Sequence, residues 1–134
     1  MAADDQFYRE YILDHYKNPR NFGRLEQPDI SHEEENPLCG DVVAIDLKVE
    51  DGSIADVRFH GRGCAISQAS ASLLTERLKG MRLEDAKHIG KEDVLDELGI
   101  EISPARIKCA LLSLKVLKAG AYGLGEWPGE DEED

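Results

Sequence analysis

The most restrictive feature of the sequence is an Asp51-Gly52 pair that separates two stretches of alternating hydrophobicity. Asp-Gly is a strong signal for a two-residue turn between antiparallel strands. The stretch before the turn, residues 42–50, places four apolar side chains on one face: Val43, Ile45, Leu47 and Val49. The stretch after it, residues 53–60, places Val57 and Phe59 on one face, with Ile54 out of phase. We therefore expect a β-hairpin in which the second strand either has a bulge near Ile54 or ends early there.

Helical patterns surround this hairpin. A first helix, capped by Asp4 or Asp5, is predicted to run to about Lys17, where Asn18-Pro19 ends it. The polar stretch 20–37 is expected to be irregular, with a short strand around Gly23–Gln27. Further helices are predicted over residues 64–80, 83–89, 91–98 and 103–119. Two strands followed by a run of helices are typical of an α+β fold with a small antiparallel sheet.

Two of these helices carry specific signals at their ends or on their faces. Gly80, the last residue of the stretch 64–80, is suited to the position at which this helix stops. Ser103-Pro104 is a helix start, with a capping residue followed by proline in the first turn. In the helix that follows, three lysines share one face, which we expect to be exposed: Lys108, Lys115 and Lys118.

The length and charge of the chain restrict its organisation and its partners. At 134 residues, the chain is expected to form a single domain over residues 1–125. Residues 126–134 carry six acidic and no basic side chains, and we expect them to form a disordered, solvated tail. The net charge of −12 argues against binding nucleic acid through phosphates. No apolar run is long enough to cross a bilayer, and the N-terminus has no secretory signal, so we expect a cytoplasmic protein without a membrane partner.

The three cysteines all fall at predicted element boundaries. Cys39 precedes the first strand of the hairpin, Cys64 follows the second, and Cys109 lies in the first turns of the last helix. Because an antiparallel hairpin brings the start of its first strand close to the end of its second, Cys39, Asp41 and Cys64 should converge. Cys109 joins them only if the last helix packs with its N-terminus at the same end of the sheet. An odd number of widely spaced cysteines argues against a disulfide framework.

The surroundings of the cysteines favour metal chemistry over simple burial. Thiolates at helix N-termini are stabilised by free N–H groups, and Cys64 and Cys109 are both predicted to occupy such positions. Cations lie within three residues of these sulfurs: Arg62, Arg106 and Lys108. Three thiolates and a carboxylate form a four-ligand shell suited to zinc or to an iron–sulfur cluster. The residues therefore predict a metal site made of Cys39, Asp41, Cys64 and Cys109, with each of the three cysteines a candidate nucleophile.

The histidines are weaker ligand candidates. His15 falls on the apolar stripe of the first helix and is predicted to be packed, whereas His88 lies in a polar helix and is predicted to be exposed. His60, four residues before Cys64, is the histidine nearest to the predicted site. It is also the one candidate base for a hydrolase with a nucleophilic cysteine, a reading that has no evident orienting acid.

Four motifs in order resemble the IscU/SufU/NifU-N family of iron–sulfur cluster assembly proteins. They are "DHYKNPRNFG", "NPLCGD", "GRGCAISQASASLLTE" and "ISPARIKCALL", and the resemblance covers the chain from Tyr8 to Leu117. It implies an α+β fold with a three-stranded antiparallel sheet and a metal site that matches Cys39, Asp41, Cys64 and Cys109. It further implies a cysteine desulfurase that passes sulfur to a cysteine as a persulfide, and acceptor apo-proteins that receive the product.

Two branches of this family differ in mechanism, and the sequence shares features with both. In the scaffold branch, a transient cluster, expected to be 2Fe–2S, is built on the three cysteines, and the protein is not an enzyme; zinc is expected in the cluster-free form. That branch has a histidine where this chain has Lys108, and an LPPVK motif where this chain has "ISPAR", which puts recognition by an Hsp70-type chaperone in doubt.

The other branch, the zinc-dependent sulfurtransferases of the SufU type, relays persulfide sulfur without holding a cluster. "GCAISQAS" and Lys108 resemble that branch. The 45-residue interval between Cys64 and Cys109 is short for the insertion that branch carries. A purely structural zinc site in a binding module is a further alternative, although such sites are usually richer in Cys or His than in Asp.

Overall fold

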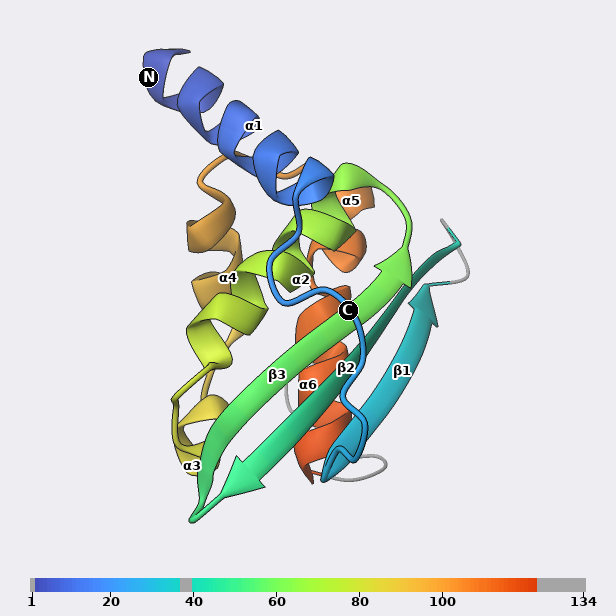
Figure 1. The fold of residues 1–134 in the computed structure, drawn as a ribbon. Coiled ribbons are helices and arrows are strands. Elements are labelled where there is room, and N and C mark those ends of the chain that lie inside the picture. The colour runs from blue at the N-terminus through green and yellow to red at the C-terminus, as the bar shows by residue number, and fades with distance from the viewer. Residues whose placement is uncertain (1, 37–39, 123–134) are drawn as a thin grey trace.

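The predicted hairpin forms the centre and one edge of a three-stranded antiparallel sheet (Figure 1). The structure is a computed structural model that describes residues 2–36 and 40–122. Its strands are β1 (Ile30–Asn36), β2 (Asp41–Glu50) and β3 (Ser53–Arg62), in the order β1-β2-β3. The helices in this part of the chain are α1 (Ala2–Lys17), α2 (Ala65–Leu78), α3 (Leu83–Ala86), α4 (Lys91–Leu98), α5 (Pro104–Ala110) and α6 (Leu112–Tyr122). The predicted α+β class is confirmed, whereas the acidic tail lies outside the described residues.

The turn between β2 and β3 has the backbone that its sequence predicts. Asp51 and Gly52 both adopt positive φ, 54° and 79°, as a type I′ hairpin turn requires. The pairing between the strands shifts between Lys48 and Val49 and continues to Glu50 and Ser53, so the irregularity is a bulge and not an early strand end. This shift lets Ile54 reach the interior, where it is fully buried.

One face of the sheet packs against helices α2 and α6, and the main core lies between them (Figure 1). Val43, Ile45 and Leu47 of β2 point into this core together with Val57 and Phe59 of β3. Because the side chains of a strand alternate between faces, Asp41 belongs to the same face as Val43. The carboxylate of Asp41 therefore lies on the helix-covered face of the sheet, at the end where β2 begins.

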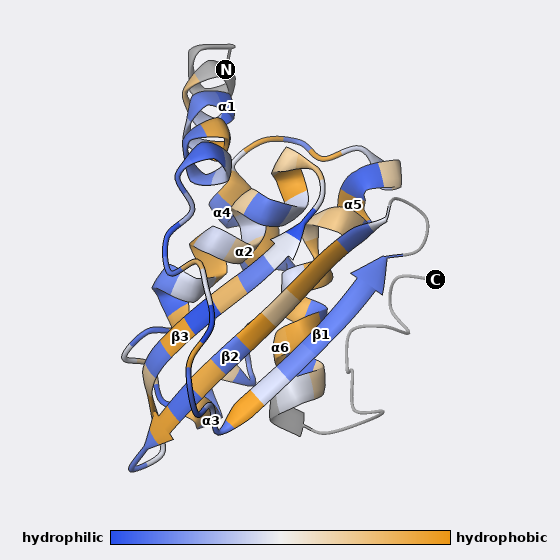
Figure 2. Cartoon of the chain, turned by 45° about the vertical axis from the view of Figure 1, so that its right-hand side comes forward, coloured by the Kyte–Doolittle hydropathy of each residue, from blue (hydrophilic) through white to orange (hydrophobic). Residues whose placement is uncertain are grey.

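Strand β1 corrects the prediction for the irregular segment. The predicted strand at Gly23–Gln27 is wrong, and the strand lies instead at Ile30–Asn36. Apart from Ile30, β1 is polar, whereas β2 beside it is hydrophobic (Figure 2). The alternation that identifies a half-buried strand is therefore missing from β1, which is an edge strand paired on one side with β2.

The segment between α1 and β1 crosses the opposite face of the sheet (Figure 1). It is held by backbone hydrogen bonds to β3, from Gly23 N to the oxygen of Phe59 and from Phe59 N to the oxygen of Asn21, at 2.7 and 2.9 Å. Further along, Leu25 N donates to the buried carboxylate of Asp46 at 3.1 Å. The segment is therefore irregular but hydrogen-bonded, and it covers part of the outer face of β2 and β3.

The last predicted helix is interrupted once. Leu111, at φ −97° and ψ 2°, separates α5 from α6, although its N–H still donates to the carbonyl of Ile107. The prediction that Lys118 is exposed is wrong, because its side chain is buried and its ammonium donates to the backbone carbonyl of Lys87. Burial lowers the pKa of Lys118 below its ordinary value.

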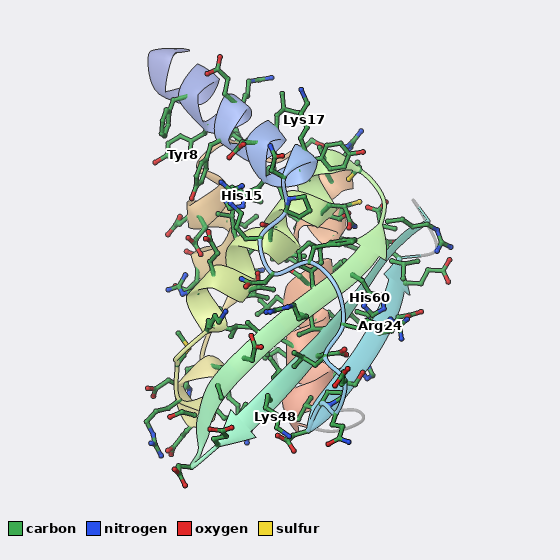
Figure 3. The ribbon with its side chains drawn as sticks, viewed as in Figure 1. Tyr8, His15, Lys17, Arg24, Lys48 and His60 are labelled. Atoms are coloured by element: carbon green, nitrogen blue, oxygen red, sulfur yellow. The ribbon has the colours of Figure 1, made fainter. Side chains whose placement is uncertain are left out.

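Helix α1 packs on α2 through a buried histidine. It begins at Ala2, so Asp4 and Asp5 lie within it and do not cap it as predicted. The side chain of His15 lies between α1 and the helices beneath it (Figure 3) and is almost fully buried, as predicted. Its Nδ1 lies 2.8 Å from the hydroxyl of Ser72. No helix in the described residues is both long and apolar enough to span a membrane.

His15 should make the stability of this packing depend on pH. Burial, reinforced by Arg20, lowers the pKa of His15, so the folded protein favours the neutral ring. As the pH falls below about 6.5, the unfolded chain takes up the proton first, and the free energy of unfolding should fall by at most about 1.4 kcal/mol per pH unit until the folded pKa is reached. Urea unfolding at several pH values between 7.5 and 5 measures this slope.

The matched comparison is His15→Gln against His88→Gln, which changes an exposed histidine. The first variant should flatten the pH dependence and the second should leave it as in the parent. Equal slopes for all three proteins would show that His15 does not titrate with folding.

Candidate metal centre

Cys64 lies in the short connection between β3 and α2. It occupies the N-terminal cap position of α2, with an extended backbone at φ −73° and ψ 166°. Its backbone N–H donates to Oδ1 of Asp41 at 3.1 Å, and its thiol lies 3.4 Å from Oδ2 of the same carboxylate. The hairpin therefore brings Asp41 and Cys64 together, as its topology predicts.

Gly63 allows this close approach. It has φ +149°, and a Cβ on this residue would lie 2.3 Å from Oδ1 of Asp41. A side chain would therefore occupy the space of the carboxylate. The motif "GRGC" shows that a glycine precedes Cys64, but the close approach between Gly63 and the carboxylate of Asp41 is seen only in the structure.

Cys109 approaches from the helical layer and is almost fully buried. Its sulfur accepts a long hydrogen bond, 3.8 Å, from the side-chain amide of Asn36 at the end of β1. Cys109 is the sixth of the seven residues of α5, so it lies within the first two turns of the helix as predicted, but beyond the free N–H groups at the helix start. The stabilisation expected from the helix dipole therefore applies to Cys64 and not to Cys109.

Three of the four predicted ligands converge. One ligand atom from each of Asp41, Cys64 and Cys109 lies within 4.8 Å of the other two. They border an open pocket of about 450 Å³ at the end of the sheet; its lining is completed by Gly40, Arg62, Gly63, Ala105 and Arg106. Helix α5 therefore packs at the same end of the sheet as Asp41 and Cys64, which the predicted site requires.

Cys39, the fourth predicted ligand, lies outside the described residues. Its neighbour Gly40 lines the pocket, and the N–H of Gly40 donates to the carbonyl of Asn36 at 2.7 Å. The role of Cys39 stays a prediction. Asn36 itself was missed by the sequence reasoning; its one signal is its place at the start of "NPLCGD", beside the first cysteine.

Cations border the pocket on its solvent side. Arg62 and Arg106 are exposed and line it, and Lys108 is exposed on α5 next to Cys109. Their charge partly offsets the negative charge of a shell built from thiolates and a carboxylate. Their exposure also leaves them accessible to an anionic group that approaches from solvent.

His60 does not belong to this group. It pairs with Ala44 on the outer face of the sheet, opposite to the face of Asp41, and it is not among the residues whose ligand atoms converge. Both ring nitrogens are buried and have no hydrogen-bond partner among the described residues. The hydrolase hypothesis, which needs His60 as a base for Cys64, has no geometric support.

Residues 7–128 match the family described as the NifU-like N-terminal domain. The chain belongs to this family. One relative, named zinc-dependent sulfurtransferase SufU, from Bacillus subtilis (strain 168), is 41% identical over 87% of this chain and 90% of its own length. A second, named iron–sulfur cluster assembly scaffold protein IscU, from Escherichia coli (strain K12), is 41% identical over 84% of this chain and 89% of its own.

A solved structure has the same fold. It is titled as an iron–sulfur cluster assembly scaffold protein for the SUF system, from Fervidobacterium islandicum AW-1, and it superposes with a TM-score of 0.70 at 28% identity. The match covers 84% of this chain and 94% of that one. The two branches distinguished in the sequence are thus both represented among relatives of equal identity.

The donor set fits a thiophilic metal. Two ligands held at about 2.0–2.3 Å in a tetrahedral site lie roughly 3.5–3.8 Å apart. The three described donors lie within 4.8 Å of one another, so they would need to close by about 1.3 Å at most. Two thiolates and one carboxylate suit zinc or iron better than magnesium or calcium, which prefer oxygen ligands throughout.

Proposed function

We propose that this protein is a scaffold for iron–sulfur cluster assembly, with Cys39, Asp41, Cys64 and Cys109 as the residues that hold the cluster. The observation that carries the proposal is the convergence of Asp41, Cys64 and Cys109 within 4.8 Å at an open pocket. The IscU and SufU relatives connect such a site to cluster assembly or sulfur transfer. The cluster is the product that the protein carries, and acceptor apo-proteins would receive it.

Sulfur would reach the site by exchange with a cysteine desulfurase. A thiolate of this chain attacks the outer sulfur of the partner's cysteine persulfide, a new S–S bond forms here, and the partner's cysteine leaves as a thiolate. Cys64 is the better-placed acceptor of the two described cysteines, because it is half-buried at the mouth of the pocket, whereas Cys109 is 2% exposed. Arg62 and Arg106 would attract the anionic persulfide.

A zinc-dependent sulfurtransferase is the second candidate, and Lys108 favours it. This residue stands next to Cys109 and is exposed, so no histidine nitrogen is available at that position as a further ligand. Zinc would then keep the thiolates deprotonated until the desulfurase displaces one of them. The SufU relative is as similar to this chain as the IscU relative.

Anaerobic reconstitution with iron, cysteine and a desulfurase separates the two functions. A scaffold should acquire visible absorbance and stoichiometric iron and sulfide. A sulfurtransferase should retain zinc and gain a persulfide, detected by mass spectrometry as an added sulfur. Neither a cluster nor a persulfide under these conditions would contradict both functions.

Asp41→Ala should prolong the life of a cluster on this protein. A carboxylate is a weaker ligand than a thiolate for a soft iron–sulfur site, so Asp41 provides the position at which an acceptor's ligand enters most easily. We expect the half-life of the cluster to rise about fivefold, which corresponds to roughly 1 kcal/mol in the barrier to release. The decay of visible absorbance after addition of a chelator measures it.

Asp46→Ala is the matched control, because Asp46 is also a buried aspartate of β2 but belongs to the outer face of the sheet. It should leave the half-life of the cluster unchanged. Faster cluster loss from Asp41→Ala than from the parent would show that the carboxylate retains the cluster.

A further inference from the structure

A second open groove lies between α1 and α4, with no lining residue in common with the metal pocket. Its volume is about 680 Å³, and it is lined by Phe7, Tyr8, Tyr11, Arg77, Asp93, Asp96 and Glu97. One wall is aromatic and comes from α1, whereas the other is acidic and comes from α4. The N-terminal end of α1 extends beyond the rest of the domain (Figure 1).

The aromatic wall is an ordered cluster of three rings. Phe7 and Tyr11 stack with their planes 8° apart, and Tyr8 meets both edge-on. Tyr8 packs directly on the backbone of Gly99, where a Cβ would lie 2.3 Å from the ring. Phe7 is 61% exposed although it is the most apolar member of the cluster. The wall is therefore fixed in position and presents ring surface to solvent.

The acidic wall is only partly neutralised. Arg77 lies 3.8 Å from Asp93 and 3.5 Å from Glu97, whereas Asp96 is exposed and forms no ion pair within the described residues. Among the residues that line the groove, three carboxylates thus face one guanidinium. Asp93 also accepts the N–H of Gly90 at 2.8 Å and interacts with the ammonium of Lys118, so Asp96 and Glu97 are the carboxylates most available to a ligand. Burial, together with Glu97, raises the pKa of Tyr11, so its phenol stays neutral and adds no charge of its own.

Rings and carboxylates across one groove suit a cation with a delocalised charge. A guanidinium binds to ring faces through cation–π attraction and to carboxylates through charged hydrogen bonds. Anionic ligands are disfavoured by the three carboxylates. A second copy of this chain is disfavoured as the occupant, because each copy has a net charge of −12.

We propose that the α1–α4 groove binds an arginine-containing basic segment of a partner protein. The guanidinium lies against Phe7 and Tyr8 and pairs with Asp96 and Glu97. This surface is independent of the metal centre, so a partner bound here leaves the pocket at Asp41 and Cys64 open. The protein could thus bind a basic partner in this groove while a cysteine desulfurase is bound at the metal site.

A hexapeptide of alternating glycine and arginine, labelled with fluorescein, is a suitable probe. Fluorescence anisotropy at low salt gives its affinity, and ¹⁵N-detected NMR titration locates it. We expect shifts confined to α1 and α4 residues that line the groove, with no shift at Gly63 or Cys64. A peptide with glutamate in place of arginine should not bind.

Variants then separate the groove from the general charge of the protein. Asp96→Asn with Glu97→Gln should weaken binding about threefold to tenfold, and Phe7→Leu about twofold to fivefold. Glu33→Gln with Glu35→Gln removes the same charge from exposed positions of β1 and should leave the affinity nearly unchanged.

Three results would overturn the proposal. One is an equal loss of affinity in the two double variants, which would indicate non-specific attraction. Another is a set of NMR shifts outside the groove. The third is a dimer in sedimentation measurements that the Phe7→Leu variant dissociates, which would show that the groove holds a second copy instead. Metal content, measured on every variant, should not change, so a failure of this proposal is distinct from a failure of the proposed metal site.

Discussion

Replacing Cys109 with serine should reduce the affinity for zinc by roughly a hundred- to a thousandfold. Structural zinc sites in zinc-finger peptides have apparent binding free energies of about 10–16 kcal/mol, so losing one of the four proposed ligands should cost roughly 3–4 kcal/mol. A serine hydroxyl stays protonated at neutral pH and is a poor ligand for zinc. Competition with a chelating dye measures the affinity, and the thiolate-to-Co²⁺ absorption band reports how many sulfurs bind.

Serine has nearly the volume of cysteine, so Cys109→Ser should fold. The comparison variant is Ser113→Ala, which changes another buried side chain one helical turn later and away from the pocket. It should keep the parent's zinc affinity and its Co²⁺ spectrum. A Cys109→Ser protein with the full sulfur-to-cobalt band and unchanged affinity would show that Cys109 is a packed thiol and not a ligand.

The part of the site that could be predicted from sequence is the part that the hairpin controls. Asp51-Gly52 determines the register of β2 and β3, and the register brings Asp41 beside Cys64. Both steps depend on local interactions between residues close in sequence. The position of Cys109 depends on how α5 and α6 dock on the sheet, which no spacing in the sequence specifies. The family resemblance implies that Cys109 lies beside them, and the structure shows this position directly.

Two of the errors in the fold, at β1 and at Lys118, have a common physical origin. Strand β1 is an edge strand, and its "SHEEEN" carries no alternation of apolar and polar residues. Hydrophobic periodicity therefore does not predict a strand there. Lysines are usually exposed, which favours an exposed Lys118, yet its ammonium donates a hydrogen bond to the carbonyl of Lys87 in the interior. In both cases a hydrogen bond to the backbone of another segment, β2 for β1 and Lys87 for Lys118, determines the structure against the local sequence pattern.

Gly63→Ala should disrupt metal binding without removing a ligand. The new Cβ would lie 2.3 Å from Oδ1 of Asp41, and the residue's φ of +149° is one that alanine rarely adopts. Because the carboxylate also accepts the N–H of Cys64 at 3.1 Å, its displacement would move a ligand and release the backbone of another. We expect zinc affinity to fall about tenfold to a hundredfold, the range seen when groups that orient metal ligands are lost.

Gly80→Ala separates this local effect from backbone strain. Gly80 also has a positive φ, +88°, but a Cβ there would meet no atom within 4 Å. The substitution should therefore cost about 1–2 kcal/mol of stability through its backbone conformation alone and leave zinc affinity unchanged. If Gly63→Ala lost stability to the same extent but bound zinc as the parent does, the contact between Gly63 and Asp41 would have no part in holding the metal. Loss of affinity in Gly63→Ala and not in Gly80→Ala would instead show that a bare backbone at residue 63 is what lets a carboxylate and a thiolate share one ion.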